Sequence, residues 1–218
     1  MLARRTVLTV GVVAMLLLTG CAATQEEFSF ESAPATVADD AVSEAGYEST
    51  GGPETLTVNR TVDAGGQQRD VTVTNYVTAY TRSVQIGGQQ RTLAGAAVFT
   101  TPSISLVGQE FNPIADQSNR QLVQRARNRV QGRIDGNRIR DVSFVENRSA
   151  TVLGRETTVG VFSGTTTVQG VEVVLRIHVT RVKHDGDFVL VAGAYPQTLA
   201  ADERPRLETV FGAVEHEG

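Results

Sequence analysis

The sequence is poor in cysteine and has no long, strongly apolar run. Cys21 is the only cysteine among 218 residues, so an intramolecular disulfide is excluded. The apolar N-terminal run, residues 6–20, contains 15 uncharged residues. A helix that crosses a membrane needs about 20 such residues. The run therefore does not favour a permanent transmembrane helix.

Lysine is also scarce, and positive charge is in deficit. Lys183 is the only lysine among 20 basic residues, which face 24 acidic ones, and the formal net charge is −4. Loss of residues 1–20 would remove two arginines and leave a net charge of −6. This balance argues against a nucleic-acid partner, because nucleic-acid binders usually carry a basic surplus. An acidic, lysine-poor composition is typical of proteins from salt-loving archaea, although a GC-rich genome would favour arginine as well.

The N-terminus has the features of a secretory signal: two arginines, then the apolar run, then small residues. Leu18-Thr19-Gly20-Cys21 resembles the lipobox of prokaryotic lipoproteins, in which the thiol is lipidated and the chain is cut just before the cysteine. We predict a signal peptide over residues 1–20, a lipid on Cys21 and a tether over residues 21–27. A lipid with two acyl chains holds a protein stably on a membrane, and it occupies the thiol.

The export route stays open between two pathways. Arg4-Arg5-Thr6-Val7-Leu8 resembles the twin-arginine motif, which directs folded proteins across the membrane. Paired arginines also occur in ordinary signal peptides.

Residues 28–218 are long enough for one domain with a buried core. The segment Gly65-Gly66-Gln67-Gln68-Arg69 recurs 22 residues later as Gly87-Gly88-Gln89-Gln90-Arg91. Paired glycines suit hairpin turns better than phosphate binding, because no helix start follows either pair. We predict an antiparallel meander with strands over 55–62, 70–84 and 92–104. Its middle strand should have one apolar and one mixed face.

The second half also favours strands, with three helices placed around the sheet. The predicted strands cover 139–146, 151–163, 165–183 and 188–195, the last preceded by an Asp185-Gly186 turn. Helices are predicted over 34–45 with Ser32 as its cap, over 119–131 with a Ser118/Gln121 capping box, and from Asp202 onward with Leu207, Val210, Phe211 and Val214 facing the core. The fold class is therefore α+β, with an antiparallel sheet built from meanders and packed with helices.

Several features together resemble known families. The two hairpin-rich halves, the helix between them and the run Val152-Leu153-Gly154-Arg155-Glu156-Thr157-Thr158-Val159 are similar to the Mog1/PsbP-type α/β sandwich. The lipobox, Gly46-Tyr47, Gly108-Gln109-Glu110-Phe111-Asn112-Pro113 and His178-Val179-Thr180-Arg181-Val182 resemble a family of haloarchaeal lipoproteins known only as a domain of unknown function. The resemblance implies a fold and a habitat, and it assigns no catalytic residue.

The candidate contact surface is the arginine-rich helix in the middle of the chain. Five arginines crowd it: Arg120, Arg125, Arg127, Arg129 and Arg133. Arginine stems beside a buried stripe usually serve packing and rim ion pairs. The functional alternative is a docking patch for an anionic lipid headgroup, a glycan or a protein partner.

Signs of catalysis and metal binding are weak. His178, His184 and His216 are widely spaced and form no recognisable metal motif, so no metal or other cofactor is predicted. A cation held by His184, Asp185 and Asp187 would need more oxygen ligands, and a plain turn is the better interpretation. Glu110 and Asp116 are the least arbitrary acid–base candidates. Ser163 sits one place away from a nucleophile elbow, and no catalytic residue is predicted.

Asn59 and Asn147 begin glycosylation sequons, which also arise often by chance. The sequence thus predicts a non-enzymatic binding or assembly domain, anchored through Cys21 to the outer face of the cell membrane. Its partner would be a surface protein, a glycan or a small ligand. The alternative is a carrier that holds a small apolar ligand between sheet and helices.

Overall fold

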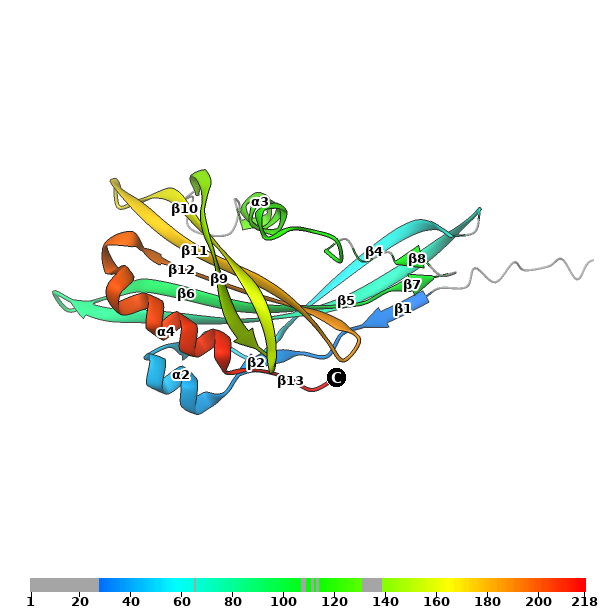
Figure 1. The fold of residues 1–218 in the computed structure, drawn as a ribbon, viewed down its shortest axis with the longest axis horizontal. Helices are drawn as coiled ribbons and strands as arrows, with labels where there is room; N and C mark the ends of the chain where they lie inside the picture. The colour runs from blue at the N-terminus through cyan, green and yellow to red at the C-terminus, as the bar shows by residue number, and fades with distance from the viewer. Residues whose placement is uncertain (1–27, 65, 107–108, 111, 113, 131–138) are drawn as a thin grey trace, which may run out of the picture.

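The computed structural model describes residues 28–64, 66–106, 109–110, 112, 114–130 and 139–218. Most of the described part of the chain is sheet, and three α-helices lie within it (Figure 1). The strands are β1 Phe28–Glu31, β2 Ala35–Val37, β3 Glu48–Ser49, β4 Glu54–Ala64, β5 Gln67–Ile86, β6 Gln89–Pro102, β7 Ser105–Leu106, β8 Gln109–Glu110, β9 Arg140–Val152, β10 Arg155–Val168, β11 Val171–His184, β12 Asp187–Pro196 and β13 Val214–His216. The helices are α2 Asp39–Ala45, α3 Asn119–Val130 and α4 Ala200–Gly212, with a 3₁₀ turn, η1 Gln197–Leu199, before α4.

Nine strands form one sheet in the order β1-β5-β6-β12-β11-β10-β9, with β3 and β4 also paired to β5. The predicted meander is confirmed, because β4, β5 and β6 pair antiparallel in sequence. Gly66, Gly87 and Gly88 have positive φ, as the predicted hairpin turns require. β1 departs from the prediction, because it runs parallel to β5 and makes the sheet mixed.

The predicted strand over residues 165–183 is wrong at its start. The chain turns back at Gln169 and Gly170, whose φ values are 51° and 81°, so residues 165–168 belong to β10. Gln169 is an unusual residue for a left-handed position, which is why composition did not reveal this turn. The Asp185-Gly186 turn between β11 and β12 is confirmed.

The helices cover both faces of the sheet (Figure 1). Helices α2 and α4 lie on one face, over a core cluster that includes Tyr80, Val191 and Leu207. Helix α3 lies on the other face, where Leu122 and Val123 pack with Phe162. Its predicted capping box is confirmed, because Ser118 N and Oγ donate to Gln121 Oε1 at 2.8 and 3.0 Å.

The first helix is shorter than predicted, because residues before it form a strand. Ala35–Val37 is β2, which pairs with β13, and α2 begins at Asp39. Ser32 does not cap the helix, because its hydroxyl lies 3.1 Å from Thr100 Oγ1 inside the fold. The predicted stop at Gly46 is confirmed by its φ of 70° and by the Tyr47 N–H bonded to Val42 O.

The end of the chain also differs from the prediction. Leu207, Val210 and Phe211 are buried on α4, as expected. Val214 is buried too, but it lies in β13 after the helix has ended. The polar residue Glu203 completes the buried side of α4, where Arg82 Nη1 donates to its Oε1 at 2.7 Å.

The mixed face of β5 is not a solvent face in its second half. Tyr80 is 3 % exposed, and its Oη accepts the Val37 N–H at 2.8 Å. Thr78 Oγ1 donates to Ala35 O at 2.8 Å. Strand β2 therefore lies across this face and uses the hydroxyls of β5 as partners for its backbone.

Gly193 of β12 lets α4 approach the sheet closely. A Cβ added at Gly193 would lie 2.3 Å from Leu207 Cδ1 and 2.8 Å from Leu207 Cδ2. Leu207 is 1 % exposed, so it has little room to move aside.

We therefore expect Gly193→Ala to lower the free energy of unfolding by about 1–3 kcal/mol through overpacking. Gly95→Ala in β6 is the matched control, because the nearest atom to its added Cβ, Tyr80 O, is 3.8 Å away. In urea, the unfolding midpoint should fall for Gly193→Ala and not for Gly95→Ala. Equal midpoints for the two variants would contradict the close packing.

Candidate functional site

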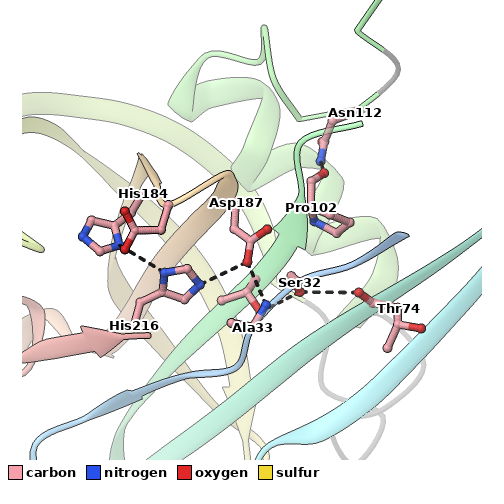
Figure 2. A network of polar contacts seen from close by, with 10 residues as sticks. Ser32, Ala33, Thr74, Pro102, Asn112, His184, Asp187 and His216 are labelled. Carbon is pink, nitrogen blue, oxygen red and sulfur yellow. Dashed lines mark hydrogen bonds and ion pairs between the residues drawn. The ribbon is translucent and has the colours of Figure 1, made fainter. Parts of the chain in front are cut away.

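Polar side chains from three distant segments meet beside the β11–β12 turn (Figure 2). The turn brings His184 and Asp187 opposite each other at the ends of β11 and β12. The pairing of β13 with β2 brings in His216, which lies opposite Ala35. Ala33, two residues before β2 begins, completes the group.

Asp187 is the buried centre of this group. Its Oδ2 accepts the backbone N–H of Ala33 at 2.7 Å and lies 3.1 Å from Nε2 of His216 (Figure 2). The side chain of His216 has no exposed surface and that of Asp187 is 9 % exposed. The carboxylate therefore holds the orientation of the His216 ring.

The other nitrogen of His216 faces the turn. His216 Nδ1 lies 3.1 Å from Nδ1 of His184. The same nitrogen of His184 lies 3.2 Å from Oδ2 of Asp185, which is more than half exposed. One ligand-type atom from each of His184, Asp185 and His216 falls within 4.8 Å of the others.

The hydrogen bonds indicate which nitrogens carry protons. A carboxylate only accepts, so His216 Nε2 donates to Asp187. In a neutral ring Nδ1 of His216 is then an acceptor, and the hydrogen between the two histidines belongs to His184. Two imidazole nitrogens thus face each other, and a cation that replaced the hydrogen between them would have both as ligands.

His184 and His216 are far apart in the sequence, and the expectation that they do not come together is wrong, because the two side chains are in contact. Their contact depends on the pairing of β13 with β2, which has no local signal in the sequence. The predicted turn at residues 185–186 is present, but Asp187 points inward and does not join Asp185.

His178 lies apart from this group, inside the sheet. It is 4 % exposed, and its Nε2 lies 2.8 Å from Tyr195 Oη. Burial, and after it the charges of Arg148 and Arg204, lowers the pKa of His178 to about 4. This is a neutral core histidine with a hydroxyl partner.

The arginines of α3 divide between the surface and a cavity. Arg120 is exposed, and its guanidinium lies 5.6 Å from the centre of the Phe144 ring, which is itself 43 % exposed. Arg125 is half-buried and lines a cavity on the same face of the sheet. Arg127 and Arg129 belong to α3, but their side chains, like all of Arg133, lie outside the described residues.

The cavity beside Arg125 has a volume of about 70 Å³. Its walls are mainly apolar, with Val58, Val71, Val73 and Phe99 among them, and Asn75 adds a polar group. One water needs about 10–15 Å³ by this measure, so the cavity admits about five waters.

The remaining predicted residues are scattered. Asp116 is exposed before α3, and the side chain of Glu110 is not described. Asn59 and Asn147 are exposed on β4 and β9, where a glycan would have room. Ser163 is half-buried within β10.

Cys21, the predicted signal peptide and the tether precede the described residues. Within the described part of the chain, no helix is long and apolar enough to cross a membrane.

One family model matches most of the chain. It is described as a domain of unknown function (DUF6517), and it covers residues 34–215. No curated protein matches the sequence.

Two solved structures show weak similarity. Cyanobacterial PsbP (CyanoP) from Synechocystis sp. PCC 6803 is 10 % identical, with 86 % of this chain and 94 % of that chain covered and a TM-score of 0.38. PA94, a protein of unknown function from Pseudomonas aeruginosa, is 7 % identical, with 67 % and 89 % covered and a TM-score of 0.29. A PsbP protein is among these structures, but TM-scores this low carry no argument about the fold of this chain.

The buried histidine yields a prediction about pH. The folded chain holds His178 with a pKa of about 4, against 6.5 for an unperturbed histidine, so the unfolded chain binds its proton first as pH falls. Stability from this residue is complete above pH 6.5 and declines toward pH 4. The loss is up to about 3 kcal/mol, at about 1.4 kcal/mol for each unit of pKa difference.

Between pH 4 and pH 7, the free energy of unfolding measured in urea should therefore change less steeply with pH for His178→Gln than for the wild-type protein. The glutamine keeps a polar group near Tyr195 and does not titrate. Equal slopes for the two proteins would contradict the low pKa of His178.

Proposed function

Because the chain belongs to the DUF6517 family, whose description names no activity, we propose its function from its own residues. We propose a lipid-anchored domain on the outer face of the cell membrane, which binds or assembles with another surface component and catalyses no reaction. The observation that carries the proposal is Leu18-Thr19-Gly20-Cys21, placed directly after an uncharged run and two arginines.

The tether limits where the domain acts. Residues 21–27 lie between the proposed lipid on Cys21 and the first strand at Phe28. Seven extended residues span at most about 25 Å. The start of β1 would therefore stay within this distance of the membrane surface, and the partner would be a membrane or surface component.

The proposed contact surface is the outer side of α3. Arg120 lies over the exposed ring of Phe144 and presents a cation beside apolar surface. The sequence adds Arg127, Arg129 and Arg133 to the same segment. An anionic group on a lipid, a glycan or a protein is the ligand chemistry that these side chains favour.

A second candidate function is a carrier for a small apolar ligand. The apolar walls of the cavity beside Arg125 favour it. Its volume of about 70 Å³ admits the end of an aliphatic chain, whereas small-molecule pockets usually measure about 300 Å³ or more. The binding role is therefore preferred.

Cys21→Ser tests the anchor. The variant should leave the membrane fraction or accumulate with its signal peptide uncut, because serine cannot form the thioether. Membrane fractionation and the intact mass of the protein measure both outcomes. A variant that stays membrane-bound at the size of the wild-type protein would exclude the anchor.

Arg120→Gln tests the contact surface. A lost exposed charge pair weakens binding by up to about 1 kcal/mol, so recovery of a cross-linked membrane partner should fall about fivefold. The matched control is Arg204→Gln on α4, an exposed arginine on the opposite face of the sheet, beside Glu208. Equal recovery from all three proteins would place the contact surface elsewhere.

A further inference from the structure

We propose that His184, Asp185 and His216 form a binding site for one divalent transition-metal ion, of the class represented by Zn²⁺. The site does not depend on the proposed anchor or contact surface, because its ligands lie on the β11–β12 turn and on β13. Two imidazole nitrogens and one carboxylate oxygen are the donor set that Zn²⁺ accepts in proteins.

The distances within the group fit such an ion. With Zn–N distances of about 2.0–2.1 Å, neighbouring ligand atoms of a tetrahedral site lie about 3.3 Å apart. The two Nδ1 atoms of His184 and His216 are 3.1 Å apart, and His184 Nδ1 is 3.2 Å from Asp185 Oδ2. The remaining ligand pair lies within 4.8 Å. Asp185 is exposed, so its carboxylate can rotate to close that gap.

The second coordination shell is already in place at His216. Metal-bound histidines usually donate their other ring N–H to a carboxylate, which orients the ring and raises the basicity of the ligating nitrogen. Asp187 Oδ2 is this acceptor at 3.1 Å from His216 Nε2. The Ala33 N–H fixes the same oxygen from the other side at 2.7 Å. The lone pair of His216 Nδ1 is thereby directed toward His184.

Binding of the ion would replace the hydrogen bond between the two histidines with two metal–nitrogen bonds. Without it, one hydrogen lies between the two Nδ1 atoms and is contributed by His184. Moving that hydrogen to Nε2 of His184 frees both Nδ1 lone pairs and leaves both rings neutral, as metal ligation requires. His216 has no exposed side-chain surface, which holds one ligand rigid before binding.

The ion would join two parts of the chain. His184 is the last residue of β11 and Asp185 lies in the turn that follows it, whereas His216 belongs to β13, which pairs with β2. Three protein ligands also leave one position for water or for an anionic group from outside. Because Asp185 is exposed, that position would face solvent at the edge of the site.

The test uses the full chain purified without a polyhistidine tag, stripped with a chelator and titrated with Zn²⁺ by calorimetry. Cys21→Ser serves as the background, because an unmodified thiol would bind the ion as well. We expect one Zn²⁺ per chain, a rise in melting temperature with Zn²⁺ concentration, and no comparable effect of Ca²⁺, which prefers oxygen ligands.

His184→Ala and Asp185→Asn should each weaken binding, the histidine variant by more than the about 10–100-fold that loss of an outer-shell partner causes. Asp187→Asn should weaken it within that range. His178→Gln is the matched control, because it removes the third histidine outside the site and should bind Zn²⁺ like the background protein.

Circular dichroism of the metal-free proteins reports whether each variant folds, and the visible absorption of bound Co²⁺ reports nitrogen ligation in the background protein without any substitution. Absence of saturable Zn²⁺ binding, or equal binding by His184→Ala and the background, would overturn the proposal. A Co²⁺ spectrum typical of six oxygen ligands would overturn it as well.

Discussion

The carboxylate of Asp187 holds the first and the last described segments of the chain in place. It is buried, and its Oδ2 meets the backbone of Ala33 and the ring of His216. These residues are separated by 154 and 29 positions in the sequence, so the contact closes two loops at once. A buried charge is strongly destabilising unless it is paired. Burial of the Asp187 carboxylate therefore requires that the segments carrying Ala33 and His216 are both in place.

The segments held by Asp187 also organise the packing on one face of the sheet. Strands β2 and β13 pair with each other, and β2 is held on β5 by the hydroxyls of Thr78 and Tyr80. Helix α2 follows β2 in the chain, α4 precedes β13, and the two helices contact each other. The opposite face is packed differently. Helix α3 covers part of it, and Phe144 lies beside Arg120.

The features that the sequence predicts well are those with a local physical cause. Positive φ at Gly66 and at Gly87 and Gly88 forms the turns of the first two hairpins. Asp185-Gly186 forms the turn between β11 and β12, and Ser118 with Gln121 caps the start of α3. Two of the failures have non-local causes. Ala35–Val37 reads as helix until its partner β13 is known, and the contact of His184 with His216 exists only because of that pairing. The turn at Gln169 was missed because its residue type is unusual there.

The parallel pairing of β1 with β5 has a mechanical consequence. Residues 28–31 align with residues 71–74 along their whole length, and the chain enters β1 from its first residue. A force applied to the preceding segment acts along the strand, so it shears the four aligned pairs together and does not peel them apart one at a time. Directly behind them, Ser32 and Ala33 are fastened to Thr74 and Asp187. The N-terminal end of the described domain is therefore arranged to resist a pulling force directed along β1.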